Sequence, residues 1–253
     1  MWQLTRTEFP AELVGTIIDF SHSDHCTLAK CSLVSKMWLP TSRLHLFEHV
    51  KLTSANFAAF LALFGTVHCS LLPYIHTVTM FGAGWKSLQA AITCLTILKE
   101  LETLCLVKVT LQPGRPTPIS GFHNLKALDM SQAIFETFTH LTGVVASFPF
   151  IERLRIDNSE WHSSPGESLA VAPSTLRAVD IGRCSKTPIF HWLIGSAPDL
   201  ITVSLSLFRT TEIRPAVQYL RYLGPSLEHL ELTQFLGSWA SGRVATIHLH
   251  YSC

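Results

Sequence analysis

Leu125-Lys126-Ala127-Leu128-Asp129-Met130 is the clearest copy of a six-residue phrase, apolar-x-x-apolar-x-apolar, that returns along the whole chain. The starts of the seven clear copies are separated by 24 to 27 residues. A period of this length indicates a structural repeat, in which each unit buries its apolar edge against its neighbours. The other copies begin at Ile75, Leu101, Ile151, Leu176, Leu200 and Leu227, with a weaker one at Phe47.

Each phrase alternates apolar and polar residues at the period of a strand, whereas the segments between phrases carry helical spacing. A strand that is followed by a helix and returns to a parallel neighbour predicts an α/β fold with a parallel sheet. The array spans residues 47–235 and resembles the leucine-rich repeat family, which implies an α/β solenoid. The helical segments are residues 88–98, 135–148, 189–194 and 213–223.

The array departs from that family at its turns. The family usually places Asn or Cys three residues after the third apolar position, and here only Cys184 matches. Because buried backbone groups need hydrogen-bond partners, we expect the turns to find them by other means. The sequence therefore predicts an irregular solenoid, followed by an irregular tail over residues 236–253.

Residues 1–46 lack the phrase and predict three short helices. Pro10 and Glu12 suit the start of the first helix, Asp24 can cap the second, and Pro40 precedes the apolar residues of the third. Four motifs in this order resemble an F-box, and the F-box before a repeat array resembles fungal F-box proteins with leucine-rich repeats. These motifs are Phe9-Pro10-Ala11-Glu12-Leu13, Ile17-Ile18, Cys31-Ser32-Leu33-Val34-Ser35-Lys36-Met37-Trp38 and His45-Leu46-Phe47.

The F-box resemblance implies a partner. Such helices dock onto the Skp adaptor of a cullin-RING ubiquitin ligase of the SCF type, and the chain would recruit a protein target to it. Phe9 stands where the family usually has Leu, and Met37 replaces a more usual polar residue. A plain helical cap for the solenoid is the alternative for these helices. The residues that match the family's contact motif are Pro10, Leu13, Ile17, Leu33 and Val34.

Composition narrows the classes of protein. Hydrophobic residues make up 47% of the chain and charged residues 15%, which argues against disorder. The formal net charge of +1 is too small to hold a nucleic acid backbone by general electrostatics. The seven cysteines form no C-x-x-C pair, so a reducing, intracellular compartment is expected, in the cytoplasm or the nucleus.

Two further classes lack support in the sequence. Residues 57–75 are apolar over nearly the length of a membrane span, but Gly65 and Pro73 interrupt them, and a core helix is the better interpretation. The chain has no Gly-x-Ser-x-Gly nucleophile motif, and the loop at residues 81–87 lacks the pattern of a phosphate-binding loop. We expect no membrane segment, no enzyme activity, no cofactor and no metal site.

The outward face of the predicted sheet is the candidate site for a target. The third, fifth and seventh residues of each phrase should point away from the core, and charge gathers on the middle strands. Asp129, Arg155 and Asp180 take equivalent places on three successive strands, so they could instead neutralise one another. The candidate target-binding residues are Asp129, Arg153, Arg155, Asp157 and Asp180. A repeat scaffold without ligase docking is the alternative function, and the identity of the target is not encoded in any motif.

Overall fold

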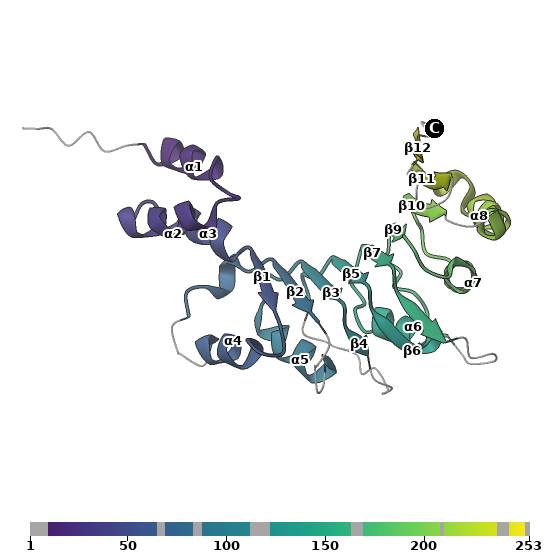
Figure 1. Ribbon diagram of the computed structural model, residues 1–253, viewed down its shortest axis with the longest axis horizontal. Helices are drawn as coiled ribbons and strands as arrows, with labels where there is room; N and C mark the ends of the chain where they lie inside the picture. Colours follow the sequence, from purple (N-terminus) through teal and green to yellow (C-terminus); the bar gives the residue numbers. More distant parts are fainter. Residues whose placement is uncertain are drawn as a thin grey trace, which may run out of the picture.

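The computed structural model describes residues 10–64, 69–82, 88–111, 122–162, 169–207, 210–236 and 243–250. Within these ranges the chain is an α/β fold with a large, mainly parallel sheet, which confirms the predicted class. Figure 1 shows the sheet curving into an arc, with strands along its inner side and helices along its outer side. In the described part of the chain, no helix combines the length and the apolarity that crossing a bilayer requires.

Every phrase of the sequence contributes one strand to the main sheet. Each strand begins at the third residue of its phrase, and the first apolar residue, such as Leu101 or Ile151, is buried in the core just before the strand. Successive phrases pair in register, with Leu104 opposite Leu128 and Leu128 opposite Leu154. These parallel strands are β1 (His49–Leu52), β2 (Thr77–Phe81), β3 (Thr103–Val107), β5 (Ala127–Ser131), β7 (Arg153–Asp157), β9 (Ala178–Ile181), β10 (Thr202–Leu207) and β11 (His229–Leu236).

Most of the segments between phrases form an outer layer of helices, whereas the described residues between β3 and β5 and between β7 and β9 include a short strand and no helix. The expected helix over residues 135–148 begins only at Phe138, because Phe135 belongs to a short strand and the Thr137 hydroxyl accepts the backbone N–H of His140 at 3.1 Å, which caps the helix. The outer helices are α4 (Phe57–Phe64), α5 (Leu88–Cys94), α6 (Phe138–Ala146), α7 (Lys186–Ser196) and α8 (Thr210–Leu223), with 3-10 turns η1 (Leu72–Tyr74), η2 (Leu95–Ile97) and η3 (Gly224–Ser226).

At the turns, hydrogen bonds to neighbouring strands replace those expected from Asn or Cys, and a second, smaller sheet follows these turns. Lys108 and Gln132 adopt left-handed backbone angles, with φ of 56° at each, and their N–H groups donate to Ser131 and Asp157 carbonyls of the next strand at 2.9 Å. Ser159 stands where the family has Asn, and its hydroxyl donates to the Met130 carbonyl at 3.1 Å. The turns are therefore satisfied by neighbouring units. This sheet, which the sequence did not predict, contains β4 (Thr110–Leu111), β6 (Ile134–Thr137) and β8 (Glu160–His162).

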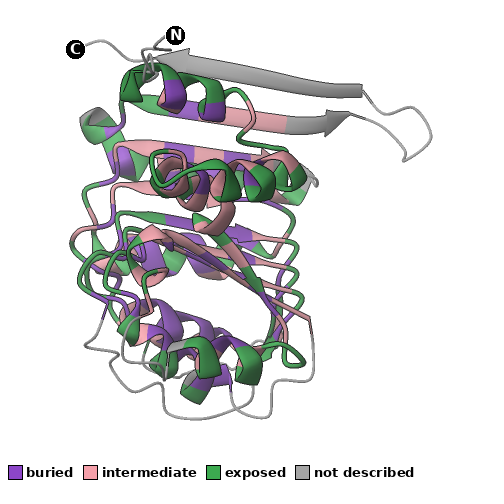
Figure 2. Cartoon of the chain, turned by 90° about the vertical axis from the view of Figure 1, so that its left-hand side faces the viewer, coloured by how far each residue is buried: buried purple, intermediate pink, exposed green. Residues whose placement is uncertain are grey.

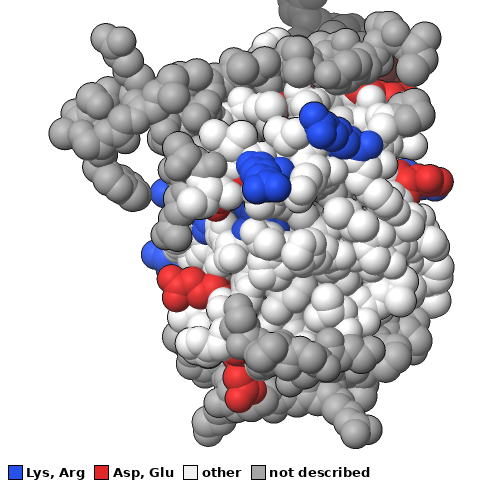
Figure 3. Space-filling view, turned by 90° about the vertical axis from the view of Figure 1, so that its right-hand side faces the viewer, with Lys and Arg blue, Asp and Glu red and all other residues white. Residues whose placement is uncertain are grey.

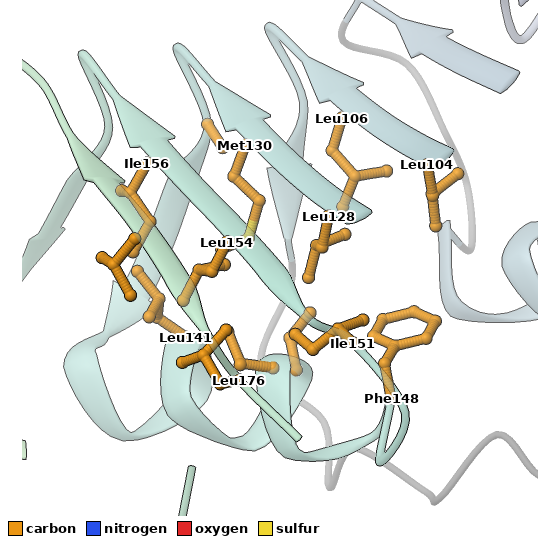
Figure 4. Close-up of a cluster of buried hydrophobic side chains, with 14 of the residues drawn as sticks. Leu104, Leu106, Leu128, Met130, Leu141, Phe148, Ile151, Leu154, Ile156 and Leu176 are labelled. Atoms are coloured by element: carbon orange, nitrogen blue, oxygen red, sulfur yellow. The ribbon is translucent and has the colours of Figure 1, made fainter. Parts of the chain in front are cut away.

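One apolar core runs the length of the array. It extends without a break from Leu52 to Leu230. Figure 4 shows Leu128 and Leu154 of neighbouring strands pointing toward Leu141 on α6. Because each layer buries side chains against the next, the array is held together by contacts between adjacent units.

The three predicted N-terminal helices are present and have a core of their own. They are α1 (Ala11–Asp19), α2 (His25–Val34) and α3 (Leu39–Phe47). Val14, Ile18 and Leu28 are buried together, and this cluster is separate from the core of the array. The Asp24 carboxylate accepts two backbone N–H groups of α2, which confirms the predicted cap. Phe9 lies outside the described residues.

The prediction of an irregular tail is wrong for residues 243–250. They form β12 (Arg243–His250), which pairs antiparallel with β11, from Leu236 opposite Arg243 to His229 opposite His250. The connection over residues 237–242 is too short for the crossover that a parallel return requires, so the chain can only come back antiparallel. Residues 237–242 and 251–253 lie outside the described part of the chain.

Candidate functional site

The sheet face that points away from helices α4–α8, here called the inner face, carries the charged residues singled out in the sequence. The strand register sets Asp129 opposite Arg155, and Arg155 opposite Asp180, on the neighbouring strands β5, β7 and β9. The third, fifth and seventh residues of each phrase share this face, because side chains alternate along a strand. The predicted alignment of the three charges is therefore present.

Arg155 lies between two carboxylates. Its Nε is 3.2 Å from Oδ2 of Asp180, and its Nη1 is 3.7 Å from Oδ2 of Asp129. All three side chains keep substantial exposure to solvent, so these ion pairs contribute little to stability. In the structure, therefore, Asp129, Arg155 and Asp180 neutralise one another. A partner that binds Arg155 would have to compete with both carboxylates for its guanidinium group.

The Asp157 carboxylate contacts the backbone of the turn that follows β9. Its Oδ1 accepts the backbone N–H of Arg183 at 2.9 Å, and its Oδ2 lies 3.8 Å from Nη2 of the same residue. A side chain at Gly182 would collide with the Asp157 carboxylate, so the glycine is required for this close approach. Asp157 thus fixes the turn after β9 and also presents charge on the inner face.

A pocket of about 390 Å³ opens on the inner face over β7, β9, β10 and β11. We call it the inner-face pocket. Three of the predicted residues line it, namely Arg155, Asp157 and Asp180. Asp129 contacts it only through Arg155, and Arg153 lies outside its lining, exposed at the start of β7. Its remaining lining residues are Gly182, Arg183, Ser204, Ser206, Glu231 and Thr233.

The pocket lies further toward the C-terminal strands than the sequence indicated. Ser204, Ser206, Glu231 and Thr233 all belong to the predicted outward row, but three of these four residues are uncharged, whereas the predicted site was centred on the charged residues of the middle strands. The signal that could have found them is position alone, since the fifth residues of successive phrases run from Asp129 to Glu231 across neighbouring strands.

Carboxylates dominate the electrostatics of the pocket. Burial raises the pKa of the Asp180 carboxyl, Arg155 opposes this rise, and the carboxylates of Asp157, Glu231 and Asp129 add to it. Glu231 accepts a hydrogen bond from the Ser204 hydroxyl at 3.2 Å. Figure 3 views the molecule from the right-hand side of Figure 1, where α7 and α8 lie, and shows charged side chains scattered over a mostly uncharged surface there.

A second candidate surface covers the N-terminal helices. Leu13 and Ile17, one turn apart on α1, are 50% and 43% exposed, and Leu33 and Val34 at the end of α2 are 86% and 64% exposed. Pro10 is exposed just before α1. We call these five residues the N-terminal apolar surface. Figure 2 shows exposed residues over much of the outward side of these helices.

No family model matches the chain, and no curated protein matches it significantly.

Proposed function

We propose that the chain is a substrate-recruiting adaptor of an SCF-type cullin-RING ubiquitin ligase. In this proposal residues 1–46 are an F-box-like domain that binds the Skp adaptor, and residues 47–235 are a leucine-rich repeat solenoid that holds a protein target inside the cell. The regular period of the phrases and their one-to-one correspondence with parallel strands support the repeat assignment.

The observation that carries the proposal is the division of apolar residues on the N-terminal helices. Val14, Ile18 and Leu28 form a small core, whereas the side chains of Leu13 and Ile17 remain about half exposed. Leu13 and Ile17 lie one turn apart on α1, and neighbouring exposed apolar side chains of this kind are a feature of interaction sites. Polar contacts also join α1 to α3, including the 2.8 Å pair between Asp19 and His45. Because the helices pack together without Leu13 and Ile17 being buried, these two side chains are available to a partner.

The proposed role is to supply proximity. The N-terminal helices stand at one end of the arc and the charged inner face lies along it (Figure 1), so the two surfaces are separate. A target bound on the array would be held near the ligase, which raises its effective concentration there. Other subunits would transfer ubiquitin.

The test is binding of a purified Skp adaptor to the purified chain. The wild-type chain should form a complex in size-exclusion chromatography, and Leu13→Asp should abolish it by placing an unpaired carboxylate in the contact. Ile97→Asp, at an exposed apolar position in η2 of the array, is the matched control and should leave the complex intact. If the folded wild-type chain does not bind the adaptor, the alternative of a scaffold without ligase docking replaces this proposal.

A further inference from the structure

The inner face carries opposite charges at its two ends. At the N-terminal end, Lys51 of β1 and Lys108 after β3 are exposed, and their Nζ atoms lie 4.1 Å and 5.6 Å from the centre of the Phe81 ring on β2. Within the described residues neither lysine forms an ion pair. We call Lys51, Phe81 and Lys108 the lysine-aromatic patch. Among the described residues, its two ammonium groups therefore give this end a positive charge.

The inner-face pocket at the other end has an excess of negative charge. Three carboxylates line it, from Asp157, Asp180 and Glu231, against two guanidinium groups, from Arg155 and Arg183. Both arginines already contact carboxylates, at 3.2 Å for Arg155 with Asp180 and 3.8 Å for Arg183 with Asp157. Glu231 has a hydroxyl partner but no ion pair among the described residues. Among the described side chains, a cationic group entering the pocket would therefore meet a carboxylate that has no cationic partner.

A cationic side chain fits this pocket better than the other charged ligands. A phosphate would face three carboxylates and would have to displace them from both arginines. A metal ion is disfavoured because, within the described residues, no group of acidic, His or Cys side chains is arranged to hold one. The volume of about 390 Å³ is large enough for a long side chain rather than a bare ion. The guanidinium of an arginine can bond a carboxylate with two parallel N–H groups.

The distance between the two ends sets the spacing of the ligand. The sheet order β2, β3, β5, β7, β9, β10 places five strand intervals between the patch and the pocket. Neighbouring strands lie about 4.8 Å apart, so the span is about 24 Å, which an extended peptide covers with about seven residues. On the strands between, small side chains such as Ala127 and Ser131 on β5 lie on the same face as the longer Arg153 and Arg155 on β7. A peptide backbone could lie across them.

We propose that the inner face binds an extended peptide segment with separated charges, acidic side chains over the lysine-aromatic patch and a basic side chain in the inner-face pocket about seven residues away. The idea that such a segment belongs to a ligase target rests on the proposed function. The binding of the peptide itself depends only on the array.

The test uses fluorescein-labelled synthetic peptides and fluorescence anisotropy on the purified full chain at low salt. The first peptide has two Glu, a spacer of about five Gly and Ser residues, and two Arg. The second has the same composition with Glu and Arg alternating at one end. The charge-separated peptide should bind about tenfold more tightly, because only it can reach both ends of the face. Equal affinities, or no binding of the charge-separated peptide at about 1 mM, overturn the proposal.

Matched variants locate the site. Glu231→Gln and Lys51→Gln should each weaken the charge-separated peptide about fivefold, since each removes one attractive charge. Glu102→Gln and Lys126→Gln make the same changes at an exposed pair outside the patch and the pocket, 3.8 Å apart, and should have no effect. If the control variants weaken binding equally, attraction is nonspecific and the proposal fails. The Skp adaptor is absent from this assay, so its result is independent of the docking test.

Discussion

The N-terminal helices and the repeat array distribute their apolar and charged residues in opposite ways. The helices bury a small cluster around Ile18 and leave Leu13, Ile17, Leu33 and Val34 on the surface. The array buries a continuous core and places charge on its inner face. Substitutions in the two regions should therefore have different consequences. Changes at exposed apolar positions on the helices should affect binding, and changes at buried positions in the array should affect folding.

The largest expected effect is on a charge inside the array. Lys186 is 1% exposed in its side chain, and its Nζ lies 3.3 Å from Oε1 of Glu212 on α8. Lys186→Met should lower the free energy of unfolding by about 3–5 kcal/mol, because it removes the ammonium group beside the Glu212 carboxylate in a largely buried site. Lys126→Met, at the exposed pair with Glu102, should cost at most about 1 kcal/mol. Urea denaturation measures both, and similar losses would contradict the contrast.

The next effect tests the surface of the helices. Leu13→Asp should weaken Skp adaptor binding by about 100-fold, equivalent to about 2.7 kcal/mol, since the carboxylate would be desolvated without a partner. The same change should alter the free energy of unfolding by less than about 0.5 kcal/mol, because the side chain is half exposed. Isothermal titration and thermal melting measure the two quantities. A large loss of stability with unchanged binding would reverse the roles assigned to this surface.

A smaller effect is expected at the glycine behind Asp157. Gly182→Ala should destabilise the fold by about 1–3 kcal/mol, because the new methyl group must displace the Asp157 carboxylate from the Arg183 N–H. Gly195→Ala in α7 meets no atom within 4 Å and serves as the control, with no loss expected. Thermal denaturation of the two variants provides the measurement. Equal stability of the two variants would show that displacing the Asp157 carboxylate does not change the free energy of unfolding.

The smallest effect concerns Arg155. Arg155→Ala should lower the free energy of unfolding by about 0.2–1 kcal/mol, the usual value for exposed ion pairs. It should also raise the pKa of Asp180 further, because Arg155 is the group that opposes the rise. A carboxyl with a raised folded-state pKa binds its proton more tightly when folded, so its contribution to stability increases as pH falls through that pKa. Carbon NMR titration of the aspartate side chains measures the shift, and an unchanged Asp180 pKa would contradict the pairing.

Several local features were predictable because they depend on neighbours in sequence. Asp24 caps α2 through backbone groups two and three residues away, and alternation alone placed Asp129, Arg155 and Asp180 on one face. The start of α6 was misjudged because Phe135 is apolar at helical spacing but is used by β6. A short apolar run fits either period, and only its pairing partner decides.

The sequence by itself determined the period of the chain, the class of the fold and the side of each strand that faces the core, because these follow from alternation and repetition within about 25 residues. Only the tertiary structure decided that Arg155 is shared by two carboxylates, that Asp157 rests on Gly182, and that the pocket reaches Glu231. Those contacts join residues from different units, and their distances depend on how neighbouring strands and turns pack. The pairing of β12 belongs with them, since a strand's direction depends on the length of the connection and on which sheet edge is open.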